Sequence, residues 1–161
     1  MLSHTTKGGT ELKILIGSDH LGYALKEDLK EHLQQAGHEV VDVGCDSPDT
    51  PVDYPDVAER LALRIAGGES ERGILICGTG IGMAMVANKV RGVRAAVCHD
   101  PYSAERARAS NDAQVIAFGA QIVAPVLARK LLDIWLASEF QGGRSLRKVE
   151  KIKQIDAARR G

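Results

Sequence analysis

The amino-acid sequence predicts an α/β fold: a Rossmann-like three-layer sandwich in which helices cover both faces of a five-stranded parallel sheet. Five short and nearly continuous apolar segments alternate along the chain with segments of helical pattern. Strands that are apolar on both sides are typical of parallel sheets, and crossover helices join such strands. We expect a flavodoxin-like strand order, in which the ligand binds at the switch point between the first and third strands.

The first half of the alternation follows directly from the residue pattern. A strand at residues 12–17 precedes a helix at 23–36, in which leucines recur every four residues, and Gly37 ends this helix. A second strand at 39–43 leads into a loop at 44–55, whose three prolines disfavour regular structure. Such a loop can carry functional residues.

The second half continues the alternation, and one further helix follows its last helix. The expected elements are a helix at 56–66, the central strand at 74–77, a helix at 83–88, a strand at 94–98, a helix at 102–110, a strand at 115–118, a long helix at 122–138 and a polar helix at 144–160. Residues 1–10 contain Ser, Thr and Gly and are expected to form a flexible lead-in. Residues 11–161 then form a single domain that ends in the C-terminal helix.

Composition and charge exclude several classes of protein. The 161 residues are 44% hydrophobic and carry 21 basic and 21 acidic side chains. Such a chain can bury the core of one domain, and its balanced charge offers no broad basic field to nucleic acid or to a membrane surface. Its three cysteines form no CxxC pair, and the N-terminus lacks an apolar signal sequence, which indicates a cytoplasmic protein without structural zinc. Small molecules are the expected partners.

The turn between the central strand and the next helix is the first candidate site. Cys77 ends the strand, Thr79 lies in the turn, and Gly78, Gly80 and Gly82 have GxGxG spacing. Unpaired N–H groups at a helix start favour negative charge, and glycines let a ligand approach the backbone. Cys77 is therefore a candidate base or nucleophile, with Thr79 as a second polar group. The spacing matches neither a dinucleotide fingerprint nor a P-loop, and a Cys at a strand end is often only a small buried residue.

Further polar residues are expected near Cys77. The first strand leads into Asp19 and His20, and the carboxyl ends of the first and third strands meet at the expected switch point. A thiolate, a carboxylate, an imidazole and backbone N–H groups suit proton transfer next to a carbonyl, through an enediolate. Simpler roles are also open: Asp19 can cap the next helix, His20 can be an exposed loop residue, and Tyr54 can pack over its loop.

Six short motifs occur in a fixed order between residues 12 and 155. They are Gly17-Ser18-Asp19-His20-Leu21-Gly22, Asp53-Tyr54-Pro55, Ile76-Cys77-Gly78-Thr79-Gly80-Ile81-Gly82, Asn88-Lys89, Pro101-Tyr102-Ser103-Ala104 and Gly142-Gly143-Arg144. This set resembles the type B ribose-5-phosphate isomerases, a family that includes galactose-6-phosphate isomerase and tetrose-phosphate enzymes. The resemblance implies a Rossmann-like fold, a homodimer with active sites between subunits, and interconversion of phosphorylated aldoses and ketoses without a metal or cofactor.

The resemblance also implies roles for residues 77–82, which are called the glycine turn. Cys77 would be the base that moves a proton between C1 and C2 of the sugar. Thr79 and the amides around Gly78 and Gly80 would stabilise the enediolate. The remaining contacts from the same chain would be Asp19 to sugar hydroxyl groups, His20 to phosphate or sugar, and Tyr54 and Gly82 along the pocket wall.

Three further residues would come from the second subunit. The resemblance implies that Asn111 reaches the sugar while Arg144 and Lys148 hold the phosphate. Ribose enzymes typically have Arg where this chain has Lys148, and Lys keeps the charge but loses the bidentate fork. On the residues alone, these basic side chains can equally be the solvated face of a helix.

Ser110 departs from the family pattern in a way that bears on the substrate. Many type B ribose-5-phosphate isomerases carry a His here that is thought to open the furanose ring, whereas Ser cannot act as an acid–base group near neutral pH. His99 either supplies this group or has a structural role. Ribose 5-phosphate and ribulose 5-phosphate are the first-choice substrates because this activity is the family's commonest. The alternatives are a tetrose 4-phosphate pair, which needs no ring opening, and a non-catalytic phosphosugar-binding regulator.

Overall fold

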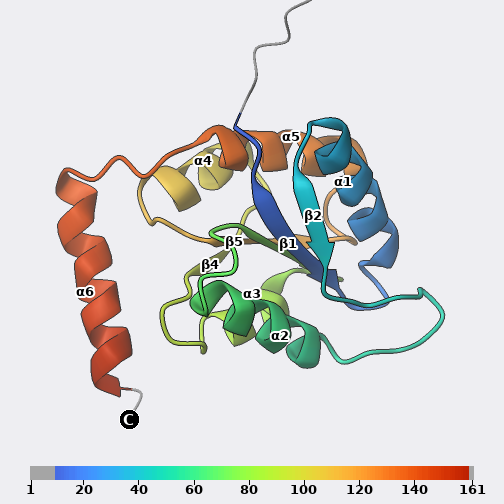
Figure 1. Cartoon of the computed structure of the whole chain (residues 1–161), viewed down its shortest axis with the longest axis horizontal. Coiled ribbons are helices and arrows are strands. Elements are labelled where there is room, and N and C mark those ends of the chain that lie inside the picture. Colours follow the sequence, from blue (N-terminus) through green and yellow to red (C-terminus); the bar gives the residue numbers. More distant parts are fainter. Residues whose placement is uncertain (1–9, 160–161) are drawn as a thin grey trace, which may run out of the picture.

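The computed structural model describes residues 10–159, so the flexible segment predicted at 1–10 lies almost entirely outside the described residues. Strands and helices alternate along most of this range, and the last two elements are both helices (Figure 1). In chain order they are β1 (Lys13–Ser18), α1 (Tyr23–Gln35), β2 (Glu39–Asp42), α2 (Tyr54–Ala66), β3 (Gly73–Cys77), α3 (Ile81–Ala87), β4 (Ala95–Val97), α4 (Pro101–Ala109), β5 (Val115–Gly119), α5 (Pro125–Ala137) and α6 (Arg144–Arg159). Every predicted element is present, with small shifts at the ends.

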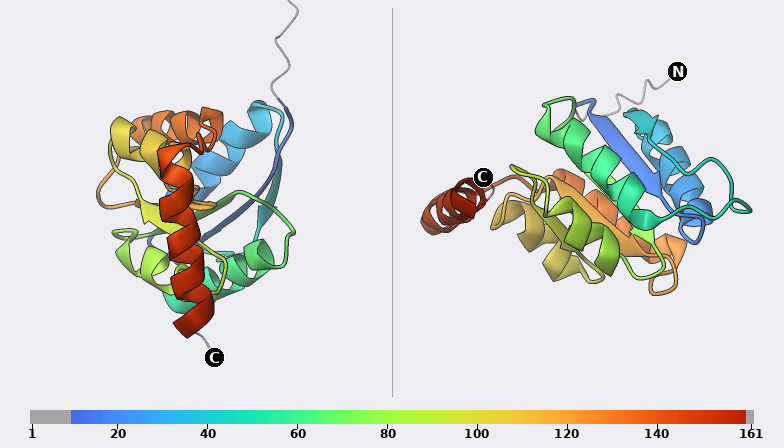
Figure 2. Two further views of the ribbon diagram at one scale, coloured as in Figure 1. Left: turned by 90° about the vertical axis from the view of Figure 1, so that its left-hand side faces the viewer. Right: turned by 90° about the horizontal axis from the view of Figure 1, so that it is seen from below.

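The strands form one parallel sheet between two layers of helices (Figure 2), which confirms the predicted sandwich. On one face, α1, α4 and α5 cover a core that includes Ile76 and Trp135. On the other face, α2 and α3 cover a core that includes Leu61 and Leu75. Because successive side chains of a strand point to opposite faces, Cys77 points to the side of α2 and α3.

The strand order is β2-β1-β3-β5-β4. Its first three positions agree with the flavodoxin-like order and place the predicted switch point between β1 and β3. The last two strands are interchanged: β5 is fully buried and lies inside the sheet, whereas β4 has three half-buried residues and lies at the edge. A right-handed return from β4 to β5 then carries α4 to the face of α1 and α5.

Three helices begin two or three residues away from their predicted starts. Helix α2 begins at Tyr54 and α3 at Ile81, each two residues before its expected start, so Tyr54 belongs to a helix and not to the preceding loop. Helix α5 begins three residues later than expected, at Pro125. Pro55 and Pro125 lie in first turns, where a missing N–H costs no intrahelical hydrogen bond.

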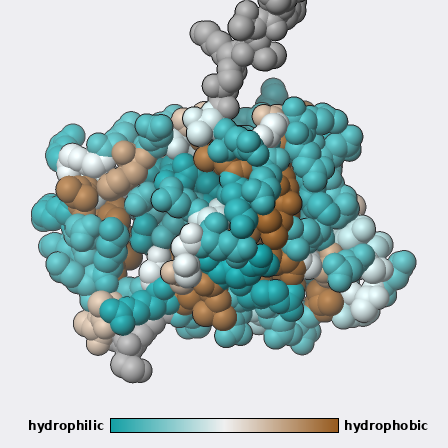
Figure 3. Space-filling view, viewed as in Figure 1, coloured by the Kyte–Doolittle hydropathy of each residue, from teal (hydrophilic) through white to brown (hydrophobic). Residues whose placement is uncertain are grey.

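Helix α6 stands apart from the three layers. It runs along one side of the molecule after an extended segment that contains Gly142 and Gly143 (Figures 1 and 2). These glycines have φ values of 64° and 55°, in the left-handed region that favours glycine. Apolar side chains appear on this part of the surface (Figure 3), where Leu146, Ile152 and Ile155 are 50%, 41% and 59% exposed. The helix therefore keeps part of an apolar face uncovered.

The remaining predictions for the chain as a whole concern membrane-spanning helices, metal sites and cellular location. No helix within residues 10–159 is long and apolar enough to cross a membrane. In the same range, no three His, Cys, Asp or Glu side chains are grouped closely enough to hold a metal ion. The three cysteines are free and buried. The cytoplasmic location expected from composition stays a prediction.

Candidate active site

The carboxyl ends of β1 and β3 adjoin at the switch point, and this region is called the crevice because doubly wound sheets bind ligands there. Ser18, the last residue of β1, is paired with Ile76 of β3, and the N–H of Asp19 donates to the carbonyl oxygen of Ile76 at 3.2 Å. The loops that follow these strands are thereby held side by side. The structure thus brings Asp19 and His20 to the turn that begins at Cys77.

The Cys77 thiol is enclosed by the glycine turn. Its residue is 5% exposed, and its Sγ accepts a hydrogen bond from the backbone N–H of Gly80 at an N···S distance of 3.1 Å. Gly80 precedes α3 and has a φ of +79°, a conformation that L side chains rarely adopt. The turn thereby aims a backbone hydrogen-bond donor at the sulfur.

The end of β5 packs directly against the backbone of the glycine turn. A Cβ atom on Gly119 would lie 2.7 Å from Cα of Thr79, and a Cβ on Gly80 would lie 2.9 Å from the carbonyl carbon of Phe118. The two backbones touch only because both positions are glycine. Thr79 itself is exposed, and its Oγ1 accepts the N–H of Ile81 at 3.3 Å. Its hydroxyl is therefore open to a ligand.

Tyr54, His20 and Asp19 form the walls of the crevice. The Tyr54 ring lies against Gly82, where a Cβ atom would be 2.5 Å from a ring carbon. The Nδ1 atom of His20 accepts the N–H of Val52 at 3.3 Å, which attaches the loop before α2 to this wall. The carboxylate of Asp19 is buried and accepts the N–H of the residue before α1 at 3.0 Å. Gly22 is the N-cap residue of α1 and has no side-chain cap hydrogen bond, so Asp19 contacts the start of the helix without being its cap.

His99 follows β4 and contacts the end of β5. Its Nε2 accepts the backbone N–H of Gly119 at 2.9 Å. Burial lowers the pKa of His99, and the adjacent Asp100 carboxylate opposes this with a smaller effect. The imidazole is therefore neutral at neutral pH, with Nε2 unprotonated. Because β5 lies between β4 and β3, His99 is one strand further from Cys77 than a flavodoxin-like order would place it.

Asn111, Arg144 and Lys148 do not join Cys77 within one chain. Helix α4 returns from the carboxyl edge of the sheet to its amino edge, so Asn111 lies at the amino edge, where Nε of Arg94 donates to its carbonyl oxygen at 3.3 Å. Arg144 and Lys148 are exposed on α6. A site that contains all of the predicted residues therefore requires a second chain.

Gly119 and Gln121 belong to the crevice but were not predicted. The N–H of Gln121 donates to the carbonyl oxygen of Gly78 at 3.0 Å, and its Oε1 lies 2.9 Å from where a Cβ on Gly78 would be. The carboxamide therefore sits on the rim of the glycine turn. The only signal in the sequence is the position of both residues at the end of an apolar strand, which becomes informative once β5 is known to adjoin β3.

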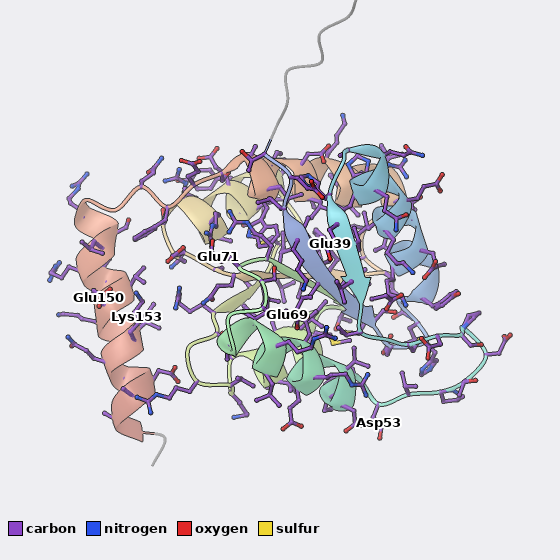
Figure 4. All side chains as sticks on the ribbon, in the orientation of Figure 1. Glu39, Asp53, Glu69, Glu71, Glu150 and Lys153 are labelled. Carbon is purple, nitrogen blue, oxygen red and sulfur yellow. The ribbon has the colours of Figure 1, made fainter. Side chains whose placement is uncertain are left out.

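A cavity of about 900 Å³ lies between the end of β2, the following loop and α2. Asp53, at the start of α2 in Figure 4, is one of its charged lining residues. These residues are Asp42, Asp46, Asp53, Asp56, Arg60 and Arg64. Carboxylates outnumber guanidinium groups by four to two, so this cavity disfavours an anion, and Cys77 is not among its lining residues. The glycine-turn crevice remains the candidate active site.

The fold and crevice together define a class: an α/β enzyme with a thiol and backbone N–H donors at the switch point, suited to proton transfer. The model of the ribose/galactose isomerase family matches residues 14–152. The chain belongs to this family and is a sugar-phosphate aldose–ketose isomerase. The resemblance seen in the motifs is thereby confirmed.

Named relatives and solved structures agree with this assignment. D-erythrulose-4-phosphate isomerase of Pectobacterium atrosepticum is 54% identical over 141 residues, which cover 88% of this chain and 93% of the relative. Ribose-5-P isomerase B of Listeria innocua is 50% identical over 149 residues, 92% and 100% of the two chains. The structure of ribose-5-phosphate isomerase B of Clostridium thermocellum has a TM-score of 0.89 at 46% identity, covering 91% and 99%. That of Mycoplasma genitalium, with bound ribulose 5-phosphate, has a TM-score of 0.86 at 38% identity, covering 90% and 96%.

Proposed function

We propose that Cys77 is the base that moves a proton between C1 and C2 of a phosphorylated sugar. The observation that carries this proposal is the buried Cys77 sulfur, which receives the N–H of Gly80 at 3.1 Å at the switch point. Removing a proton next to a carbonyl produces an enediolate, whose negative oxygen needs hydrogen-bond donors. Thr79 and the amides of Gly78 and Gly80 are the proposed donors. Return of the proton to the neighbouring carbon, together with transfer of the hydroxyl proton from O2 to O1, converts the aldose into the ketose, a change that is redox-neutral overall.

The sugar contacts in the same chain are assigned by their place in the crevice. We propose that Asp19 binds sugar hydroxyl groups and that His20 contacts sugar or phosphate. Tyr54 and Gly82, which pack on each other, form the opposing wall. In support, the Mycoplasma genitalium relative binds ribulose 5-phosphate in its crystal structure.

Two substrate pairs fit this reaction. Ribose 5-phosphate and ribulose 5-phosphate are the first candidates, because the Listeria and Clostridium relatives are ribose-5-phosphate isomerases. A tetrose 4-phosphate pair is the second, and two observations favour it. Ser110 offers no acid–base group for ring opening, and the Pectobacterium relative is a D-erythrulose-4-phosphate isomerase. For the pentose, the sequence left His99 as one alternative for the group that opens the ring.

We further propose a homodimer in which each site is shared. Asn111, at the amino edge, and Arg144 and Lys148, on α6, are the residues that a partner would supply. The uncovered apolar side chains of α6 support this arrangement, because burying them against a second chain is favourable. The partner's two cations would then hold the phosphate.

The test is a side-by-side measurement of turnover on ribose 5-phosphate, erythrose 4-phosphate and galactose 6-phosphate, by wild type and by Cys77→Ala. We expect wild-type turnover of a pentose or tetrose phosphate that the variant lacks. Binding of a phosphosugar without turnover of any of the three would support the regulator hypothesis instead. Preferential turnover of galactose 6-phosphate would overturn both proposed substrate pairs.

A further inference from the structure

His99 supplies a hydrogen-bond acceptor to β5 just beyond the point where backbone pairing between β4 and β5 stops. Pairing between β4 and β5 runs from Ala95 with Val115 to Val97 with Ala117. The N–H of Gly119 therefore lies beyond the last paired residues, and Nε2 of His99 accepts its hydrogen bond at 2.9 Å. A buried N–H without an acceptor is unfavourable, so the side chain does here what a backbone carbonyl does elsewhere in the sheet.

Gly119 packs directly against the backbone of the glycine turn. A Cβ atom on Gly119 would be 2.7 Å from both Cα and the carbonyl carbon of Thr79, so these backbones are in direct contact. Gly119 is also paired with Cys77 in the register of β3 and β5. Any displacement of Gly119 is therefore transmitted to Thr79, two residues after the proposed base, and to Cys77 itself, which lies opposite Gly119.

The environment of His99 keeps its imidazole neutral. The side chain is half-buried, and among the described residues the charged group that acts on it is the exposed carboxylate of Asp100. That carboxylate accepts the N–H of Ser103 at 2.8 Å as the cap of α4. Burial lowers the pKa of His99 and Asp100 raises it. Because burial has the larger effect, the pKa lies below its ordinary value near 6.5.

We propose that His99 is a positioning residue, which acts through Gly119 to hold the Thr79 backbone in place, and is not the group that opens a sugar ring. This inference rests on the proposed function, in which Thr79 and its neighbours stabilise the enediolate. Protonation of Nε2 replaces its lone pair with an N–H, which cannot accept from Gly119. The hydrogen bond is therefore present at neutral pH and lost as the pH falls through the value at which His99 titrates in the folded protein.

The kinetic test compares His99→Gln with His99→Ala on ribose 5-phosphate and erythrose 4-phosphate. The Gln side-chain oxygen can reach the position of Nε2 and accept from Gly119, but it cannot transfer a proton near neutral pH. For a positioning residue, we expect His99→Gln to keep turnover within about threefold and His99→Ala to lose about 5- to 10-fold in kcat on each sugar that the wild type converts, the cost of one hydrogen bond. If His99 opened the ring, both variants would lose the ribose reaction alone.

The structural test uses NMR of the wild-type protein and does not depend on activity. We expect Nε2 of His99 to have the ¹⁵N shift of an unprotonated nitrogen at pH 7, and the Gly119 amide proton to titrate together with the His99 ring. In His99→Gln the Gly119 amide should no longer titrate. A protonated Nε2 at pH 7, or a Gly119 amide that ignores the His99 titration, would overturn the inference even with normal kinetics. If no sugar phosphate is converted, the proposed function fails while the NMR result still decides the contact.

Discussion

At the level of single residues, the thiols of Cys77 and Cys98 have different surroundings. Burial, with a further contribution from Asp100, raises the pKa of the Cys98 thiol to about 11, so it is protonated at neutral pH and serves as a small core residue. Cys77 is also buried, but its sulfur receives the N–H of Gly80 at 3.1 Å. A donor at the sulfur distinguishes the proposed base from the packing residue.

Replacing each thiol separately tests this distinction. We expect Cys77→Ala to lower turnover by at least about 100-fold, the usual contribution of a positioned acid–base group, while phosphosugar binding persists. Cys98→Ala should keep turnover and lose only stability. Iodoacetamide should inactivate the wild type, with substrate protecting it, and mass spectrometry should find the label on Cys77. Unchanged turnover by Cys77→Ala would remove this residue from the mechanism.

Ser110 is the residue that separates the two proposed substrates. Its Oγ accepts from Nη1 of Arg106 at 3.2 Å at the end of α4, next to Asn111. If ring opening limits the pentose reaction, Ser110→His should raise turnover of ribose 5-phosphate and leave erythrose 4-phosphate unchanged, because a tetrose 4-phosphate has no furanose to open. Ser110→Ala is the matched control and should alter neither reaction. No gain with Ser110→His would show that ring opening is not limiting.

At the level of elements, the sequence was sufficient for the strands and helices but not for the order of the last two strands. Alternating apolar and helical segments predicted every element, because each apolar strand is bounded by glycine, polar or charged residues. Strand order depends on which strand fills the interior, and β4 was expected to have five residues but has three. Only the observed order reveals that Gly119, and not His99, adjoins Cys77.

The turn that joins β3 to α3 provides a test at this scale. Gly80 and Gly37 both have positive φ, +79° and +89°, but a Cβ on Gly80 meets Phe118 at 2.9 Å whereas one on Gly37 meets nothing within 4 Å. Gly37→Ala should cost about 1–2 kcal/mol of stability from the left-handed conformation alone and keep full turnover. Gly80→Ala should cost more and also reduce turnover, because the N–H that reaches Cys77 is displaced. Thermal melts and kinetics of both variants measure this, and full activity of Gly80→Ala would contradict it.

At the level of the whole molecule, the predicted site is divided among three places. Cys77 lies at the carboxyl edge of the sheet, Asn111 at the amino edge, and Arg144 on a helix outside the layers (Figure 2). The motifs could indicate these residues because each has a chemistry suited to a phosphosugar. That a second chain supplies Asn111 and Arg144 was implied by the family resemblance alone. The residue pattern could not indicate it, because the place of Arg144 depends on the direction in which the segment after α5 leaves the domain.

Hybrid dimers test whether the site is shared. Cys77→Ala and Arg144→Ala should each be inactive or nearly so, the second mainly through a raised KM because a phosphate ligand is lost. If Arg144 acts on the partner's site, a hybrid has one site with both defects and one with neither. Co-expression with two affinity tags and random pairing should then restore about one quarter of wild-type activity, since half of the dimers are hybrids and each has one intact site. The purified hybrid should have half. Lys151→Ala, which removes a charge from α6 outside the proposed clamp, should be active by itself. An inactive hybrid, or a monomer in sedimentation, would show that each site uses one chain only or that Arg144 has another role.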